Sequence, residues 1–206
     1  MTEEIKATSA TTKKAPYHHR NLREALVTAG RTLLEERGMR GFTLRECARR
    51  AEVSHAAPAH HFASLDDLLA EIAARGFVEL AAMMAAEARR APDAAGRLVG
   101  QGVGYMAFAA ANPMLFRLMF SQERSEAAKV VREAHFATVA AAIPDASAEV
   151  KARMSDFAWA TVHGFIGLVL ESQIGGAESA RALKARGLAI LSAMAETVMR
   201  TGGAPA

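Results

Sequence analysis

The sequence is poor in cysteine, proline and aromatic residues, and each shortage excludes a class of protein. Its 206 residues include one cysteine, six prolines and an aromatic fraction of 6%. The single cysteine, Cys47, excludes a disulfide framework within the chain and fits a reducing cytoplasm, where we expect the protein to reside. Few prolines and aromatic residues, in a sequence rich in alanine, argue against a β-sandwich and favour helices.

Long hydrophobic runs and a strong excess of one charge are also missing. No uninterrupted apolar segment has the length that spans a bilayer, so the sequence predicts no membrane association. Residues 1–16 lack the apolar centre of a secretion signal, and their Thr, Ser, Lys and Glu content predicts a disordered arm. The formal net charge is only +3, so any contact with nucleic acid must come from a local patch.

Apolar residues recur at helical spacing through most of the chain, which predicts an all-α protein. Hydrophobic residues make up 51% of the sequence, enough for a sizeable core. The stretch 157–170 is apolar on nearly every side, which predicts a helix buried on two faces. Helices are predicted over residues 17–37, 43–51, 54–62, 64–90, 93–111, 114–120, 125–142, 147–173 and 178–200.

The first three predicted helices have the layout of a helix-turn-helix motif. Thr43 and Glu46 have the spacing of a capping box at the start of the second helix. Glu52 and Val53 follow that helix as a tight turn, and Ser54 is a candidate N-cap for the third. In a helix-turn-helix the third helix enters the major groove of DNA, and its early residues face base edges and phosphates.

The side chains predicted to contact DNA are basic or short and polar. Ser54, His55 and His60 are hydrogen-bonding residues on the third helix, and Thr43 begins a helix whose free N–H groups can meet a phosphate. The complete predicted set is Arg20, Arg40, Thr43, Arg45, Ser54, His55, Ala56 and His60.

The stretch "GFTLRECARRAEVSHAAPAHHFASLDDLL", residues 41–69, resembles the TetR/AcrR family of transcriptional regulators. Two positions depart from the family pattern: Ala59 stands where the family commonly has Tyr, and Leu65 where it commonly has Lys. Because both family residues contact phosphates, their absence predicts weaker DNA binding unless the N-terminal arm compensates. The matching positions are Thr43, Ala48, Val53, Ser54, His61, Phe62, Ser64 and Leu68.

A second resemblance lies in the C-terminal part. The stretches "YMAFAAANPMLFRLMF" and "WATVHG" resemble the branch of the same family named for its Trp-His-Gly motif, carried here by Trp159, His163 and Gly164. The resemblance implies a DNA-binding domain over residues 17–75 and a helical bundle for effector binding and dimerisation over residues 76–201. Side chains predicted to line the effector site are Met106, Phe116, Met119, Phe120, Phe136, Trp159 and His163.

These features together predict a ligand-responsive transcriptional regulator that is not an enzyme and needs no cofactor. We expect a repressor that a small, largely apolar effector releases from a palindromic double-stranded DNA operator. We also expect a homodimer, in which helices 147–173 and 178–200 pair with their copies. The stripe on the last helix is Leu183, Ile190, Leu191, Met194 and Val198. The competing hypothesis is a helical ligand- or partner-binding protein whose DNA binding is weak or lost.

Two catalytic or metal-binding alternatives are weaker. His55, His60 and His61 are the candidate zinc ligands. However, His60 and His61 are adjacent, so on a helix their side chains point about 100° apart, and no Cys or acidic residue lies at ligand spacing. Ser155, Asp156 and His163 suggest a hydrolase triad, but the sequence offers neither a nucleophile elbow nor a strand to carry one.

Cysteine and glycine also have plainer interpretations. Cys47 falls on the side of its helix that should face the core, which favours a buried small hydrophobe over a thiol sensor. The glycines of "GRLVGQGVGY" lack the lysine of a phosphate-binding loop. Gly100 and Gly104 are four residues apart, which favours a close approach of two helices, with space for a ligand as the alternative.

Overall fold

A computed structural model describes residues 19–121, 126–176 and 178–202, with side chains from Leu22 onward. The predicted N-terminal arm, residues 1–16, lies outside the described part of the chain. Within that part the protein has no strand, so the predicted all-α class is confirmed. Its elements are α1 (His19–Arg37), α2 (Leu44–Arg50), the 3-10 helix η1 (Ala57–His60), α3 (Leu65–Ala88), α4 (Ala94–Ala111), α5 (Pro113–Ser121), α6 (Glu126–Ala142), α7 (Ala148–Leu170) and α8 (Ala180–Gly202).

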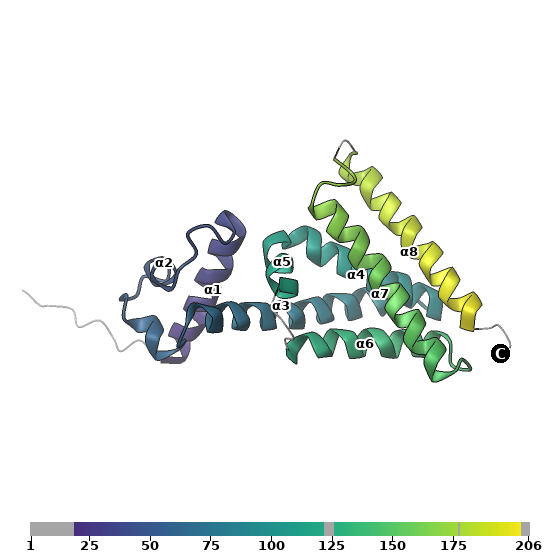
Figure 1. The fold of residues 1–206 in the computed structure, drawn as a ribbon, viewed down its shortest axis with the longest axis horizontal. Coiled ribbons are helices and arrows are strands. Elements are labelled where there is room, and N and C mark those ends of the chain that lie inside the picture. Colours follow the sequence, from purple (N-terminus) through teal and green to yellow (C-terminus); the bar gives the residue numbers. More distant parts are fainter. Residues whose placement is uncertain (1–18, 122–125, 177, 203–206) are drawn as a thin grey trace, which may run out of the picture.

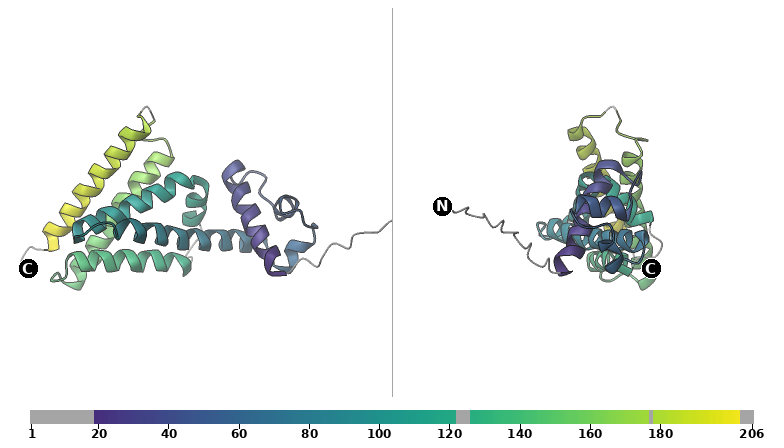
Figure 2. Two further views of the ribbon diagram at one scale, coloured as in Figure 1. Left: turned by 180° about the vertical axis from the view of Figure 1, so that it is seen from behind. Right: turned by 90° about the vertical axis from the view of Figure 1, so that its left-hand side faces the viewer.

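Helix α3, 24 residues long, joins the two ends of the molecule. Figures 1 and 2 show α1 and α2 beside one end of α3, and α4 to α8 around the other end. Helix α3 contacts α1, α4, α5 and α6. It begins with a capping box, in which Ser64 and Asp67 bond each other's backbone N–H groups at 3.1 and 3.0 Å. The same helix therefore belongs to the helix-turn-helix unit and to the bundle.

Two glycines allow α3 and α4 to touch through their backbones. A Cβ atom on Gly100 would lie 2.7 Å from the Glu87 carbonyl oxygen, and one on Gly104 would lie 2.7 Å from that of Met83. No side chain fits at these distances, so the packing interpretation of these glycines is confirmed. At its C-terminal end α4 meets α5 at a bend of 106°.

One continuous apolar core runs from the helix-turn-helix unit into the bundle. Cys47 has no exposed surface in this core, and burial raises the pKa of its thiol to about 11. The thiol therefore stays protonated at neutral pH, as expected for a small buried hydrophobe. Among the residues that the structure describes, no single helix is long and apolar enough to cross a membrane.

Three of the five residues in the apolar stripe predicted on the last helix are not free to pair with a second copy. Leu191, Met194 and Val198 are all buried in the core of their own chain, because α8 packs against α4 and α7. The exposed large apolar side chains of this region are Phe157, Leu168 and Leu188.

Candidate functional site

The helix-turn-helix begins with the predicted cap and turn. Thr43 accepts a hydrogen bond from the backbone N–H of Glu46 at 3.1 Å, although the Glu46 carboxylate turns to Arg49 rather than back to Thr43. Glu52 has φ +56° and ends α2, after which the Val53 N–H bonds the Ala48 carbonyl at 3.0 Å. The backbone therefore reverses direction at the predicted turn.

The third helix of the motif differs from the prediction. The sequence predicts a helix over residues 54–62 with Ser54 as its cap, whereas the structure has a single 3-10 turn over Ala57–His60 and no capping bond from a side chain. Pro58 explains the difference, because it lacks the N–H that an α-helix starting at Ser54 would need for its first backbone bond. The chain instead bonds Ala57 N–H to the Ser54 carbonyl at 3.0 Å.

The side chains predicted to contact DNA form an exposed set. Every member of this set whose side chain the structure describes is exposed, including His60 in η1. Arg20 lies in α1, and its side chain is outside the described part of the chain. The exposed members are Arg40, Thr43, Arg45, Ser54, His55, Ala56 and His60.

The arginines of this face differ in their pairing. Arg49 is held by the Glu46 carboxylate at 2.7 Å, and Arg50 forms a two-pronged ion pair with Glu36. By contrast, no carboxylate of the described residues lies within 4.0 Å of Arg40 or Arg45. These two guanidinium groups are therefore the ones available to a phosphate.

A network of ion pairs fixes α1 against α3 behind this surface. Arg23 donates two hydrogen bonds to Glu71 at 2.8 and 2.9 Å, and Arg75 donates to Glu71 at 2.8 Å. Arg75 also pairs with Glu24. The two arginines lower the pKa of the Glu71 carboxyl to about 2, mainly through the hydrogen bond from Arg23. The network is therefore fully charged at neutral pH.

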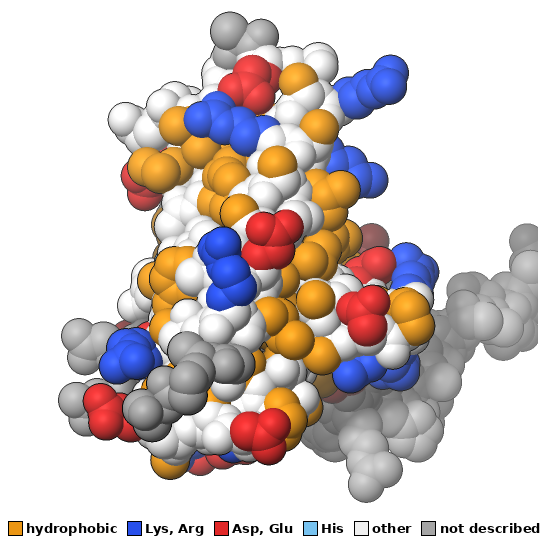
Figure 3. Space-filling model, turned by 90° about the vertical axis from the view of Figure 1, so that its right-hand side faces the viewer, with side chains coloured by type: hydrophobic (Ala, Val, Ile, Leu, Met, Phe, Trp, Pro, Cys, Tyr) orange, Lys and Arg blue, Asp and Glu red, His pale blue; other side chains and the backbone are white. Residues whose placement is uncertain are grey.

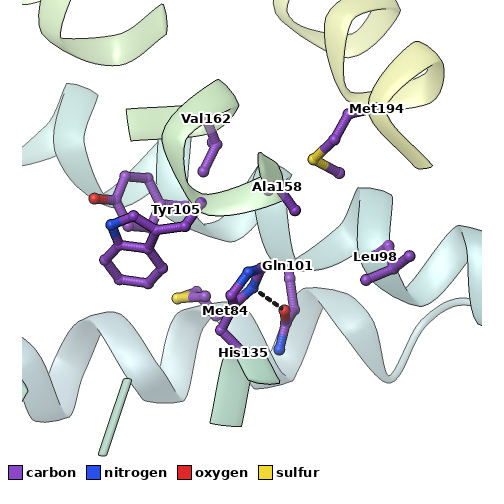
Figure 4. Close-up of a pocket in the computed structure, with 10 residues that line it drawn as sticks. Met84, Leu98, Gln101, Tyr105, His135, Ala158, Val162 and Met194 are labelled. Carbon is purple, nitrogen blue, oxygen red and sulfur yellow. Dashed lines mark hydrogen bonds between the residues drawn. The ribbon is translucent and has the colours of Figure 1, made fainter. Parts of the chain in front are cut away.

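A small cavity lies within the bundle (Figure 4). Side chains from five helices converge on it, and none of them carries a formal charge. Its volume is about 10 Å³, room for about one water molecule. The lining residues are Met84, Leu98, Gln101, Gly102, Tyr105, His135, Ala158, Trp159, Val162 and Met194.

Gln101 and His135 form the polar part of this cavity (Figure 4). Nδ1 of His135 faces the Gln101 side-chain oxygen at 3.2 Å, and Nε2 faces the Ser155 carbonyl at 3.0 Å. Burial lowers the pKa of His135, which favours the neutral ring. A neutral imidazole donates through one nitrogen only, so one of the two oxygens lacks a donor from this ring.

Beside the cavity, aromatic rings from α4, α5 and α7 pack around a second histidine. The Tyr105 hydroxyl lies 2.6 Å from Nδ1 of His163, whose ring centroid lies 4.7 Å from that of Phe120 and 5.7 Å from that of Phe116. The centroids of Tyr105 and Trp159 are 5.5 Å apart. We call Tyr105, Phe116, Phe120, Trp159 and His163 the aromatic cluster.

The structure brings together four of the seven residues predicted to bind an effector. Trp159 lines the cavity, and Phe116, Phe120 and His163 complete the aromatic cluster. Two methionines point elsewhere: Met119 packs under Gly76 of α3, and Met106 packs against Gly187 of α8.

Phe136 does not line this cavity, because its side chain is 43% exposed on the outer side of α6. The neighbouring residue, His135, is the one that points into the cavity. Neighbouring side chains on an α-helix point about 100° apart, so Phe136 faces outward where His135 faces the cavity. Gln101 was also missed, and its signal was a polar residue inside the otherwise apolar stretch 98–104 of α4.

No three His, Cys, Asp or Glu side chains gather within the described ranges in a way that could hold a metal ion. His55 and His60, considered as zinc ligands, are both exposed. The histidines of the bundle bond to Gln101, Ser155 and Tyr105 instead.

A helical chain with an exposed helix-turn-helix at one end and an apolar bundle at the other defines a DNA-binding regulator as the class of protein. The family model described as bacterial regulatory proteins, tetR family, matches residues 26–72. The model described as the tetracyclin repressor-like C-terminal domain matches residues 98–191. Together the two models cover more than half of the chain, which belongs to the tetR family of bacterial regulators. The subgroup named for the Trp-His-Gly motif stays a prediction.

Solved structures share the fold. A protein with unknown function from Rhodococcus sp. RHA1 is 29% identical, with a TM-score of 0.73 over 91% of this chain and 98% of that one. A TetR family transcription regulator from Marinobacter aquaeolei VT8 is 12% identical, with a TM-score of 0.63 over 85% and 95%. A TetR variant from Acinetobacter baumannii AYE, solved in complex with minocycline, is 18% identical, with a TM-score of 0.63 over 87% and 97%. No curated protein matches the chain.

Proposed function

We propose that this protein is a homodimeric transcriptional repressor that leaves a palindromic operator when a small, largely apolar effector binds its helical bundle. The observation that carries the proposal is the exposed set of hydrogen-bonding and basic side chains around α2 and η1, with Arg40 and Arg45 unpaired among the described residues. Such a set supplies both phosphate contacts and donors for base edges.

The proposed dimer uses the outer face of α7 and α8. Phe157, Leu168 and Leu188 are 39, 45 and 46% exposed there. Figure 3 views the molecule from the side at which α8 lies in Figure 1, and hydrophobic side chains gather over the middle of that face. Gly164 has nothing within 4 Å of a Cβ position, so this part of α7 leaves room for a second helix to approach closely. A two-fold axis here would present two helix-turn-helix units to one duplex.

The chemistry of the cavity favours an uncharged effector. Its lining is apolar except for Gln101, Tyr105, His135 and Trp159, and a charged group would lose its hydration there without an ionic partner. A cavity of about 10 Å³ is far below the roughly 300 Å³ or more that a drug-sized molecule needs. The effector would therefore bind a more open arrangement of the helices, and this difference in affinity would shift the population.

The deciding experiment is a gel-shift assay of the purified protein on the DNA upstream of its own gene, at several salt concentrations. A repressor of this kind retards the fragment at low salt, and its affinity falls linearly on a log–log plot as salt rises. Failure of a folded dimer to retard any upstream fragment at low salt would refute the proposal. That outcome would favour the alternative, a helical ligand- or partner-binding protein. Ala59 and Leu65 support this alternative because neither side chain can donate a hydrogen bond to a phosphate.

A further inference from the structure

The first turn of helix α5 receives its cap from the helix-turn-helix unit. The backbone N–H of Leu115 donates to Oε1 of Glu35 at 2.8 Å, and that of Met114 donates to Oε2 at 3.3 Å. Glu35 lies in α1, about eighty positions earlier in the sequence. A carboxylate at a helix N-terminus satisfies free N–H groups and interacts favourably with the helix dipole.

The residue that would ordinarily cap α5 is otherwise engaged. Asn112 immediately precedes Pro113, the first residue of α5, and so occupies the N-cap position. Its side-chain nitrogen donates to the Phe108 carbonyl at 3.1 Å, and its side-chain oxygen accepts from Arg31 at 3.0 Å. Since Asn112 bonds backward into α4 and outward to α1, the free N–H groups of α5 depend on Glu35.

Two residues of α1 therefore hold the junction between α4 and α5. Arg31 joins Asn112 to Glu79 of α3, and Glu35 joins the start of α5. The turn after α1 packs at the same place, since a Cβ on Gly38 would lie 2.9 Å from the Met114 side chain. Helix α1 is fixed to the bundle through this junction as well as through α3.

Two side chains of α5, Phe116 and Phe120, belong to the aromatic cluster. Phe116 follows Leu115 directly, and its ring centroid lies 5.5 Å from that of Tyr105. The ring centroid of Phe120, one turn further, lies 4.7 Å from that of His163 and 5.4 Å from that of Phe77 in α3. Helix α5 is nine residues long, so a shift at the cluster moves its first turn as well.

We propose that Glu35 is the positioning residue that couples the aromatic cluster to the helix-turn-helix unit, by capping α5 from the neighbouring domain. An occupant of the cluster that displaces α5 pulls the Met114 and Leu115 N–H groups away from Glu35 and releases α1 from the bundle. Linkage requires the reverse as well, so a duplex held by the helix-turn-helix alters the stability of the first turn of α5. This coupling rests on the proposed function, whereas the cap itself does not.

The cap is tested by hydrogen–deuterium exchange of the full chain without DNA or effector. Glu35→Ala is expected to speed exchange in residues 113–121 by about tenfold, since loss of an N-cap carboxylate unlocks the first turn. The matched control is Glu36→Ala, which removes the adjacent carboxylate of the same helix, one that pairs with Arg50 inside the helix-turn-helix unit. Equal exchange of this segment in the wild-type and Glu35→Ala proteins would overturn the cap.

The coupling is tested by the same measurement with a DNA duplex that the wild-type protein retards. In the wild-type and Glu36→Ala proteins, the duplex is expected to change exchange in residues 113–121 by about threefold or more. In Glu35→Ala that still binds the duplex, this response is lost, whereas Glu35→Gln, which keeps one acceptor oxygen, retains part of it. A full response in Glu35→Ala overturns the coupling. If the wild-type protein retards no duplex, the proposed function and the coupling both fail, and the cap is still decided by the first measurement.

Discussion

The hydroxyl of Tyr105 on α4 lies 2.6 Å from Nδ1 of His163 on α7. Burial raises the pKa of Tyr105 and lowers that of His163, so both groups stay neutral around pH 7. Both groups are neutral, and the Tyr105 hydroxyl has no other acceptor among the described residues. The hydroxyl therefore donates to Nδ1, and the ring carries its proton on Nε2. His163 therefore offers one fixed N–H donor among the aromatic rings, available to an acceptor on a bound molecule.

The first prediction concerns pH. Burial lowers the pKa of His135 and His163 from the ordinary value of 6.5 in the folded chain. As the pH falls through this range, the unfolded chain therefore binds protons that the folded chain does not bind. The free energy of unfolding is therefore expected to fall as the pH is lowered from 7.5 to 5.5. Chemical denaturation across this range measures the slope. His163→Gln, which leaves an acceptor for Tyr105, should reduce the slope, and an unchanged slope would contradict the assignment.

The second prediction concerns DNA affinity. Arg45 has no carboxylate within 4.0 Å among the residues described, whereas Arg49 is paired with Glu46 at 2.7 Å. Arg45→Gln is expected to weaken binding at all sequences alike and to reduce the slope of log affinity against log salt by about 0.9, the loss of one phosphate contact. Arg49→Gln is the matched control with the same change of charge, and its effect on the slope should be smaller. Equal effects would show that a general charge effect dominates.

The third prediction concerns the α3–α4 contact. Gly104→Ala would place a methyl group 2.7 Å from the Met83 carbonyl oxygen, so the helices must separate. We expect a loss of about 1 to 3 kcal/mol in the free energy of unfolding. Gly167→Ala on α7 is the control, because nothing lies within 4 Å of its Cβ position and alanine favours helix by about 0.5 to 1 kcal/mol there. Denaturant titration compares the two, and a stabilised Gly104→Ala would contradict the close packing.

The fourth prediction concerns the dimer. Leu188→Lys places a charge on the outer face of α8, where we propose that two copies meet, and is expected to yield a folded monomer. Val130→Lys on α6 is the control, since Val130 is 51% exposed and Leu188 is 46% exposed. Light scattering after size exclusion gives the mass, and circular dichroism checks the fold. A dimer in both variants would place the interface elsewhere.

Most of the fold could be predicted because its signals are local. Apolar spacing and caps such as Ser64 predict where helices begin and end, and the turn at Glu52 is predicted from its place directly after such a helix end. The 3-10 turn is an exception, since the hydrogen bond that Pro58 cannot make outweighs the cap that Ser54 could provide.

The candidate site could be predicted only in part, because it depends on contacts between distant helices. Phe136 and His135 are neighbours in sequence, and only the packing of α6 against α3 and α7 decides which of them faces the cavity. The bonds from Leu115 and Met114 to Glu35 join residues about eighty positions apart, and no local pattern marks such a cap. The sequence alone does not show which glutamate lies beside which backbone N–H groups, because that depends on how α1 packs against α5.

Trp159 is the only tryptophan of the chain, and it stands in the wall of the cavity against Tyr105. Intrinsic fluorescence excited at the indole therefore reports from this one place, without a label and without background from the rest of the protein. Screening of candidate effectors can begin with the emission of the unmodified protein, and a spectral shift on mixing would locate the binding event as well as detect it.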